Sequence, residues 1–377
     1  MLATVMDEEW GILTRFLPEG WSELARTTGA MRRACGEIQD PGALLQILLM
    51  HVATGLSLKQ AAARAQAQGL ATITDVALLK RLRSSETWLR ELAREMFEES
   101  RFGRCRATAP QGRRLCAVDA STVEEPGATG TDWRVHYVIS LPHMRCDFYE
   151  VTDAKGGETY KRIPIQPGDI MLGDRGYGHR EGVAYVLDHK GDVIVRLNST
   201  NFPLLTTEDS SFDLLAHLRQ LQADQPDEWD VCFEAHKKRW RARLCAIRKT
   251  TTAAERSKKK ILQRAKKKQI RVRPQTLECA EYVYILVTVA RDVMGTAEAL
   301  EIYRARWQIE LCFKRMKSLL QLGHVPKRSD QSARAWIQGK LLSILLIERL
   351  VDEARFFSPW GFNLSAAKPL ARVPRSA

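Results

Sequence analysis

The chain has 377 residues, a formal net charge of +13 and 45% hydrophobic residues. This length exceeds one ordinary core, so two or three domains are expected, and the positive charge favours nucleic acid over acidic small substrates as a partner. The start of the chain has no basic region typical of a signal peptide, and the longest apolar runs are too short for a bilayer. The eight cysteines are scattered and show no metal-ligand spacing. Together these features predict a cytoplasmic protein without a membrane partner.

Residues 1–112 are predicted to be helical. An apolar helix covers Pro41–Gly55, Ser57 and Gln60 form a capping box for the next helix, Thr74 caps a third, and Glu86–Glu99 is a fourth. Short helices with a basic third member are typical of a DNA-reading helix-turn-helix, and a plain helical bundle with a charged surface explains the same pattern. The basic residues of the third helix are Lys80, Arg81 and Arg83.

Residues 113–198 are predicted to alternate strands with a helix, which indicates an α/β layer. The expected helix is Glu181–His189. The expected strands are Leu115–Val118, the hairpin Trp133–Leu141 with Met144–Thr152, Asp169–Gly173 and Asp192–Leu197.

Residues 199–280 interrupt this rhythm. A polar hairpin pairs Trp229–Glu234 with Arg239–Ile247, and a lysine-rich helix covers Ala253–Gln269. Between residues 237 and 273 the chain has 17 Lys and Arg against one acid, Glu255. Such a run suits an enzyme that holds a polyanion such as DNA or RNA, whereas the alternative is a solvated surface helix with surplus lysines.

The last part of the chain returns to an apolar strand, Glu281–Ala290, followed by a long helix, Ala297–Leu322, and another, Ala333–Arg355. Residues 357–377 contain three prolines and are expected to form an irregular tail.

Two aspartates follow apolar strands. Asp119 follows Leu115–Val118, and Asp174 follows Asp169–Gly173. The carboxyl ends of buried strands are where α/β sheets present ligands, although aspartates at strand ends also commonly cap turns.

The long helix places five polar side chains on one narrow stripe, at about 100° per residue. This stripe offers one carboxylate framed by a phenol and three cations, and its members are Tyr303, Arg306, Glu310, Lys314 and Lys317. The opposite, apolar face is formed by Ile302, Ile309, Cys312, Phe313, Met316, Leu319 and Leu320. A salt-bridged surface helix is the alternative, because Arg306 and Lys314 each stand four residues from Glu310.

Three such carboxylates would meet the needs of a phosphodiester site with two metal ions about 4 Å apart. Carboxylates are the hard ligands that Mg²⁺ prefers, and the cations of the same stripe could grip backbone phosphates.

The helix sequence YRARWQIELCFKRMK resembles the Y-(2)-R-(3)-E-(6)-K signature of the IS-four family of DDE transposases from bacterial insertion sequences. Tyr303, Arg306, Glu310 and Lys317 match at the family spacing. LCAVDAST and IMLGDRGYGHREGV are similar to the two catalytic-aspartate strands of the family, and YEVTDAKGGET to the strand between them. The resemblance runs from about residue 40 to 350.

The resemblance implies an α/β fold: a ribonuclease-H-like catalytic core with an all-helical N-terminal domain and a β-rich insertion domain. Its metal triad would be Asp119, Asp174 and Glu310, holding two Mg²⁺ ions, for which Mn²⁺ would substitute. The implied boundaries are a helical DNA-binding domain at 1–112, the core at 113–198 and 281–356, a basic insertion at 199–280 and a tail at 357–377.

The implied activity is cut-and-paste transposition: metal-dependent cleavage at the terminal inverted repeats, with a hairpin step, and strand transfer to target DNA. The partners would be double-stranded DNA at both sites and a second copy of the chain, in a nucleoid-associated homodimer assembled on DNA. Tyr303, Arg306, Lys314 and Lys317 would hold the DNA end. Further DNA-binding residues are expected in the basic hairpin, at Lys237, Lys238, Arg239, Trp240 and Arg241.

Several alternatives stay open at this point. Trp240 or Trp229 could stack on a flipped base or lie in the core, and His179 could assist Asp174 or simply begin a helix. A DNA-binding remnant that regulates transposition would keep the fold without activity. A tyrosine recombinase using Tyr303 would need an Arg-His-Arg setting that is not evident.

Overall fold

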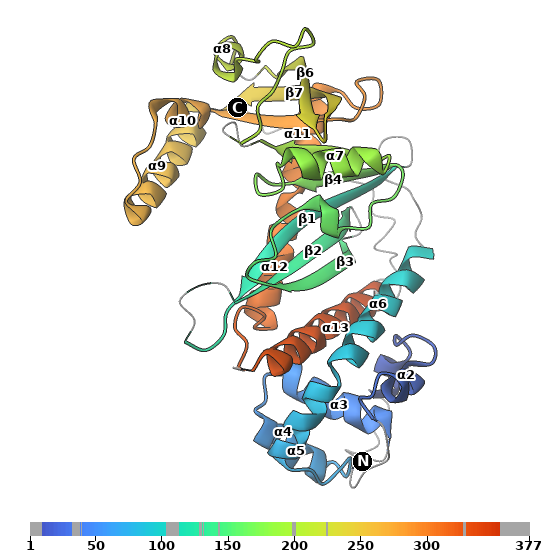
Figure 1. Ribbon diagram of the computed structural model, residues 1–377. Helices are drawn as coiled ribbons and strands as arrows, with labels where there is room; N and C mark the ends of the chain where they lie inside the picture. Colours follow the sequence, from blue (N-terminus) through green and yellow to red (C-terminus); the bar gives the residue numbers. More distant parts are fainter. Residues whose placement is uncertain are drawn as a thin grey trace, which may run out of the picture. The chain divides into compact units, whose positions relative to one another are not determined.

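The computed structural model describes residues 10–31, 38, 40–102, 113–127, 130, 132–141, 144–197, 201–223, 225–326 and 329–354. It divides into two compact units, which are considered separately (Figure 1). The first unit comprises residues 1–104, 123–132 and 315–377, and the second comprises 105–122 and 133–314. The predicted tail at 357–377 lies outside the described residues.

The first unit is helical, as the sequence predicts. Its helices are α2 (Trp21–Thr27), α3 (Pro41–Val52), α4 (Leu58–Ala67), α5 (Asp75–Ser84), α6 (Glu86–Phe102) and α13 (Asp330–Ala354). The long α13 packs along α6 and also contacts α5 and α3. The apolar stripe of α6 is buried and consists of Trp88, Leu89, Leu92 and Met96.

Predicted helix caps are confirmed. The Ser57 hydroxyl accepts from the backbone N–H of Gln60 at 3.2 Å, and the Gln60 side chain accepts from the Ser57 backbone, which completes the capping box of α4. Thr74 accepts from the Ala77 backbone at 3.2 Å and opens α5. Each cap satisfies a backbone donor that the first turn leaves without an intrahelical partner.

The basic residues of α5 are only partly free to face DNA. Lys80 is exposed, whereas Arg81 and Arg83 are half-buried. The Arg83 side chain donates to the Ser332 hydroxyl of α13 at 2.7 Å, so it helps to join two helices. Both the helix-turn-helix and the plain bundle therefore remain predictions.

The second unit is built on one mixed sheet of eight strands in the order β3-β2-β1-β4-β5-β8-β7-β6. Strands β1, β4 and β5 are parallel, while β8 pairs antiparallel with both β5 and β7. The strands are β1 (Arg114–Val123), β2 (Trp133–Leu141), β3 (Arg145–Asp153), β4 (Asp169–Gly173), β5 (Asp192–Arg196), β6 (Asp227–Ala235), β7 (Lys238–Arg248) and β8 (Tyr282–Val287).

Both predicted hairpins are confirmed, as β2–β3 and β6–β7. Because β7 also pairs with β8 along six residues, the strands of the basic hairpin extend the central sheet. The insertion and the other domain boundaries remain predictions.

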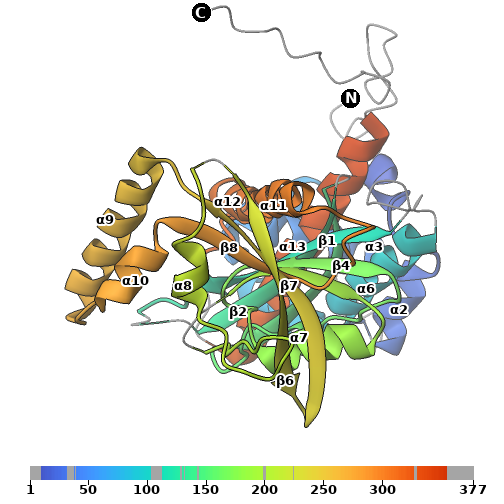
Figure 2. The same ribbon diagram turned by 90° about the horizontal axis from the view of Figure 1, so that it is seen from above.

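Helices cover both faces of this sheet. Figure 2 shows α7 (Arg180–Asp188) on one face and α11 (Thr296–Ala305) with α12 (Trp307–Leu319) on the other. Strands β4 and β5 are covered by helices on both faces of the sheet, so most of their residues are buried. The side chains that they pack against α7 are accordingly apolar. This core includes Met171, Val183, Val186, Val193 and Val195, and burying each such side chain contributes about 1.5–3 kcal/mol.

The remaining helices of the second unit are η2 (Tyr160–Arg162), α8 (Leu214–Leu218), α9 (Thr251–Lys268) and α10 (Pro274–Cys279). In Figures 1 and 2, α9 and α10 extend to one side of the sheet. No helix in the described part of the chain is long and apolar enough to cross a membrane.

Three details differ from the sequence-based expectation. The predicted long helix is divided at Arg306 into α11 and α12, because the backbone there forms the tighter i→i−3 bonds from Arg306 to Tyr303 and from Ile309 to Arg306. Leu319, expected on the apolar face, is 76% exposed. Asp119 lies within β1, which continues to Val123 because the following Ser, Thr and Val residues suit a strand.

Candidate active site

Parallel pairing of β1 with β4 brings the two predicted aspartates to the same level of the sheet. Ala117 lies opposite Leu172, and two residues further along the strands come Asp119 and Asp174. The charge of Asp174 is one of the influences that raise the pKa of Asp119, so the two carboxylates interact. The sheet register thus brings together two side chains that lie far apart in the sequence.

Local backbone groups hold each aspartate. The Asp119 carboxylate accepts from the Ala120 backbone at 2.8 Å, and that of Asp174 from the Gly176 backbone at 2.7 Å. Burial raises the pKa of Asp119 to about 7, the charges of Asp174 and Glu158 add to this, and the Ala120 hydrogen bond and Arg306 act in the opposite direction. Such a carboxylate binds a proton or a cation readily near neutral pH.

Arg306 links the third predicted carboxylate to this pair. Glu310 lies in the first turn of α12, is 32% exposed and forms an ion pair with Arg306. The guanidinium carbon of Arg306 lies 5.8 Å from the centre of the Tyr303 ring. Burial lowers the pKa of Arg306, but Tyr303, Glu310 and, least of the three, Asp119 raise it overall. Arg306 therefore faces Tyr303, Glu310 and Asp119 from the turn between two helices.

The rest of the predicted stripe is found on α12. Ile309, Phe313 and Met316 are buried, which confirms that face, while Lys314 and Lys317 are exposed. The i,i+4 ion pair of Arg306 with Glu310 is present as well, so the stripe combines a salt bridge with a group of side chains near Asp119.

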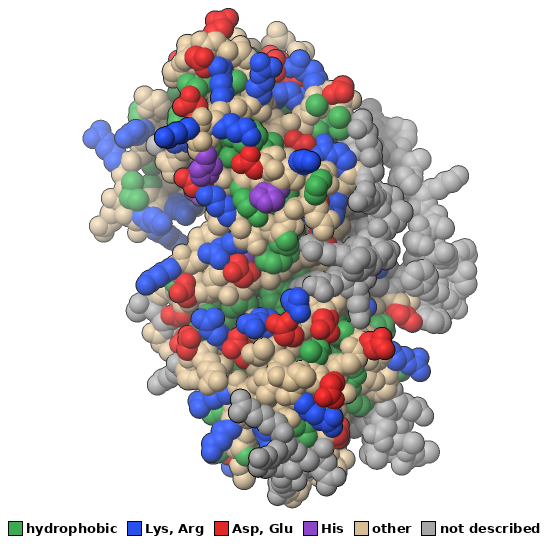
Figure 3. Space-filling view, turned by 45° about the vertical axis from the view of Figure 1, so that its right-hand side comes forward, with side chains coloured by type: hydrophobic (Ala, Val, Ile, Leu, Met, Phe, Trp, Pro, Cys, Tyr) green, Lys and Arg blue, Asp and Glu red, His purple; other side chains and the backbone are tan. Residues whose placement is uncertain are grey.

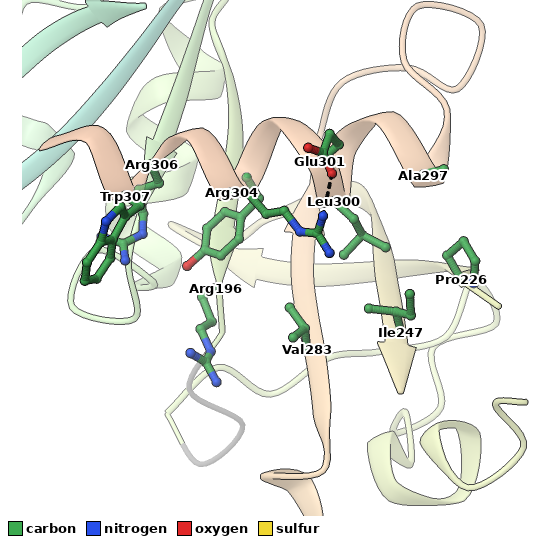
Figure 4. A pocket seen from close by; sticks show the side chains of 11 residues that line it. Arg196, Pro226, Ile247, Val283, Ala297, Leu300, Glu301, Arg304, Arg306 and Trp307 are labelled. Carbon is green, nitrogen blue, oxygen red and sulfur yellow. Dashed lines mark hydrogen bonds and ion pairs between the residues drawn. The ribbon is translucent and has the colours of Figure 1, made fainter. Parts of the chain in front are cut away.

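A pocket of about 490 Å³ lies beside Tyr303 and Arg306 (Figure 4). Arg196, at the end of β5, lines it together with Arg304 and Trp307, whose side chain is 56% exposed. The Nε of Arg196 is buried and has no hydrogen-bond partner among the described residues. A buried donor of this kind is stabilised by an anionic ligand such as a phosphate.

Arg196 interacts electrostatically with two further cations, Arg175 and Lys249. Burial and the charge of Arg175 lower the pKa of Arg196, and burial together with Arg196 and Arg175 lowers the pKa of Lys249 to about 8. Three cations thus act on one another, an arrangement that an anion would stabilise.

Comparisons with known proteins identify the family of the chain. Residues 110–346 match the family described as "Transposase DDE domain". The chain is 34% identical over 352 residues to the transposase for insertion sequence element IS421 of Escherichia coli, covering 91% of this chain and 93% of that protein. The chain belongs to the IS-four family of DDE transposases. InsL of element IS186A from Escherichia coli is also 34% identical, over 351 residues, with the same coverage. The transposase for IS231F of Bacillus thuringiensis subsp. israelensis is 24% identical over 51% of this chain and 43% of its own length.

In this DDE transposase, Asp119 and Asp174 lie at the same level of the sheet and interact, while Glu310 is ion-paired with Arg306, which also interacts electrostatically with Asp119. Among the described residues, no three His, Cys, Asp or Glu side chains form a group that could hold a metal ion as they stand. The metal triad remains a prediction, and any ion here would draw on one or two carboxylates with water or substrate phosphate.

Of the predicted DNA-binding residues of the basic hairpin, Lys237 lies in the turn between β6 and β7 and the other four begin β7. Lys237, Lys238, Arg239 and Arg241 are exposed. The Trp240 ring is half-buried beneath the ammonium of Lys238, 3.7 Å from its centre. A second predicted stacking residue, half-buried Trp229, packs against aromatic neighbours, with its ring 6.4 Å from that of Phe212 and 5.4 Å from that of His217.

Four side chains of the site were not singled out from the sequence. Arg196 and Trp307 line the pocket, and Glu158 and Tyr177 interact electrostatically with the two aspartates. The position of Arg196 at the end of a buried strand was an available signal, since the same argument selected Asp174. His179 is exposed, begins α7 without a side-chain cap, and influences Glu158.

Proposed function

We propose that the chain is a DNA transposase that binds terminal inverted repeats and performs metal-dependent strand cleavage and strand transfer. The pairing of Asp119 with Asp174 across parallel strands carries this proposal, because two interacting carboxylates at one edge of a sheet suit metal-assisted phosphodiester chemistry. Relatives named as transposases of insertion sequences support it. The sheet around these strands would be the ribonuclease-H-like core implied by the resemblance.

The donor set fits divalent metal. Asp119, Asp174 and Glu310 offer hard oxygen ligands, and the repulsion that Asp174 exerts on Asp119 would be relieved by a cation. Bound Mg²⁺ or Mn²⁺ would supply an activated water and stabilise the leaving oxygen. Arg306 positions Glu310 through its ion pair. DNA phosphate would compete with Glu310 for the same guanidinium.

The pocket, which three arginines line together with apolar side chains and Glu301, would receive the DNA backbone close to the point of cleavage. Arg196 presents a buried donor without a partner among the described residues, and Tyr303 and Arg306 lie on the same wall. The exposed indole of Trp307 offers a surface on which a base could stack, a contact worth about 1–3 kcal/mol. Trp307 suits this contact better than Trp229 and Trp240, which are half-buried.

Helix α9 would hold DNA away from the reacting bond. On the face in Figure 3, Lys and Arg are interspersed with Asp and Glu, whereas α9 has a single acid. Exposed basic residues recur every fourth residue along it. We name this set the α9 stripe: Arg256, Lys260, Arg264 and Lys268. It extends about 18 Å, a length over which one DNA strand presents about five phosphates.

The base of this helix is tied to the sheet. The Lys249 ammonium donates to the Ala280 carbonyl at 2.6 Å and to Ser257 at 3.0 Å, and Lys258 forms an ion pair with Glu281 at 2.6 Å. Because Lys249 also interacts with Arg196, cationic groups run from the pocket to the beginning of α9. A duplex that reaches the pocket could therefore also contact the stripe.

The deciding experiment is a nicking assay with the full-length protein and a DNA fragment carrying the inverted repeats that flank its coding region. We expect nicking with Mg²⁺ or Mn²⁺ but not with EDTA, and its loss in Asp119→Ala, Asp174→Ala and Glu310→Gln with DNA binding retained. Glu298→Gln is a matched control, because Glu298 is an exposed carboxylate in the first turn of the preceding helix and does not line the pocket.

Each result has a clear consequence. Full activity in any of the three variants removes that residue from the catalytic set. Wild-type protein that binds the fragment but never nicks it would favour a regulatory remnant, and a covalent adduct that disappears in Tyr303→Phe would indicate a tyrosine recombinase. Sedimentation of the protein–DNA complex would test the expected homodimer.

A further inference from the structure

A fourth carboxylate faces the aspartate pair. Glu158 lies in the connection between β3 and η2 and is half-buried. Two arginines fix the two glycines before it: Arg134 donates to the Gly156 carbonyl at 2.6 Å and Arg162 to that of Gly157 at 3.1 Å. The segment is thus held in place by side chains of β2 and η2.

The Glu158 carboxylate occupies the space beside Gly176, where any other residue would carry a Cβ. That position lies 1.9 Å from Glu158 Oε2 and 3.0 Å from Asp174 Oδ1. The two carboxylate oxygens are therefore close neighbours over the same glycine. Two oxygens that share one Mg²⁺ each lie about 2.1 Å from it, so they stand at most about 4 Å apart.

This arrangement lacks the partner that a structural carboxylate would have. Among the described residues, no hydrogen bond or ion pair is found for Glu158, and the cations that influence it, Arg134 and His179, act at longer range. The Tyr177 hydroxyl is buried, also without a hydrogen-bond partner, and is influenced by the charges of Glu158, Asp119 and Asp174. A buried donor without a partner, beside several carboxylates that repel one another, indicates a missing polar or cationic ligand.

We propose that Glu158 is a fourth carboxylate of the active site and shares a divalent cation with Asp174. This inference rests on the proposed function, since it assumes that the aspartate pair binds metal. Mg²⁺ commonly uses one or two protein carboxylates and completes its shell with water and substrate phosphate, so the pair is sufficient as a protein contribution. Tyr177 would donate to a water of that shell.

The test is a titration of the full-length protein with Mn²⁺, without DNA, followed by calorimetry or by the electron paramagnetic resonance signal of free Mn²⁺. We expect Glu158→Gln to weaken Mn²⁺ binding about tenfold or more, the range found when a group that supports a metal site is removed. Glu181→Gln is the control, because Glu181 is an exposed carboxylate on the adjacent α7 that is paired with Lys161. Asp174→Asn serves as the positive reference.

Gly176→Ala tests the same contact from the other side. Its new Cβ would force the Glu158 carboxylate to turn away, because that side-chain end is the nearest atom. We expect the alanine variant to weaken Mn²⁺ binding about as much as Glu158→Gln, and the double variant to be little weaker than either single one. Residues that act through one shared contact are non-additive in this way.

The outcomes separate the two levels of the argument. If Asp174→Asn weakens Mn²⁺ binding but Glu158→Gln does not, the fourth-carboxylate proposal is overturned while the proposed function stands. If the wild-type chain binds no Mn²⁺, both fail. Melting temperatures in EDTA exclude unfolding as the cause: Glu158→Gln removes a carboxylate without a described partner, so it should be at least as stable as the wild type. A less stable Glu158→Gln variant would assign a structural role instead and overturn the proposal.

Discussion

Asp119→Asn should stabilise the metal-free protein at alkaline pH and have little effect at acidic pH. Burial raises the pKa of Asp119 in the folded chain from an ordinary value of 3.8 to about 7. The folded state then binds a proton more tightly than the unfolded state, so this group favours folding below pH 4 and loses that contribution as the pH rises through 7. Asparagine has the same shape without the charge. It therefore removes the free-energy cost of burying the ionised carboxylate above pH 7.

The magnitude follows from the two pKa values. Their difference corresponds to about 4 kcal/mol, at about 1.4 kcal/mol for each pH unit. Solvent still reaches the half-buried carboxylate, so we expect about half of this, roughly 2 kcal/mol at pH 8. For a unit of this size that corresponds to a melting temperature about 4 °C higher or more.

The assay is thermal unfolding in EDTA between pH 4 and pH 8.5 for the wild type, Asp119→Asn and the control Asp230→Asn, whose carboxylate is exposed. Saturating Mg²⁺ at pH 8 should then raise the wild-type melting temperature and have a smaller effect on Asp119→Asn, since a ligand stabilises only the state that binds it. A lower melting temperature for Asp119→Asn at pH 8, or an equal gain at pH 4 and pH 8, would refute the reasoning.

Three further predictions address the fold and the DNA surface. Arg114→Ala leaves the buried carboxylates of Asp147 and Asp169 without their shared cation and should lower the free energy of unfolding by about 3–5 kcal/mol, measured by urea denaturation with an unchanged m-value. Ser57→Ala removes the cap of α4 and should cost about 1 kcal/mol in the same measurement, while Ser84→Ala, at an exposed position of α5, should be near neutral. Changing all four bases of the α9 stripe to glutamine should reduce the slope of log K against log salt by about 3–4 for nonspecific duplex DNA, with Mn²⁺ affinity unchanged; an unaltered slope would show that the stripe does not contact phosphate.

Local chemistry made much of the secondary structure predictable. Ser57 and Thr74 are caps whose hydrogen bonds involve residues three positions away, so the sequence alone contains both partners. The strand Asp169–Gly173 is found with the predicted bounds because a short apolar run beside glycine has few other solutions. The α/β class followed from the same local patterns.

Longer-range features were not available from such patterns. The pairing of β7 with β8 joins the basic hairpin to the central sheet, and it depends on a register between segments separated by a lysine-rich helix. The division at Arg306 was also missed, because the helical periodicity continues through it and only the backbone hydrogen bonds reveal the tighter turn. Sequence spacing correctly predicts the face of Glu310 but not its attachment to Arg306 in preference to Lys314.

Glu158 shows where prediction from sequence ends. Its segment, DAKGGET, has no periodicity and was noted only as resembling a strand between the two aspartates. Its meaning depends on Gly176, a residue of DRGYG that packs beneath its carboxylate only after β1 and β4 have paired. The two motifs therefore constrain each other: a side chain at position 176 would exclude the carboxylate, and an uncharged residue at 158 would leave Asp174 with one neighbour fewer for a cation. Neither constraint can be read from one motif alone, and a search for the residues that bind metal should begin from the space that the glycine leaves.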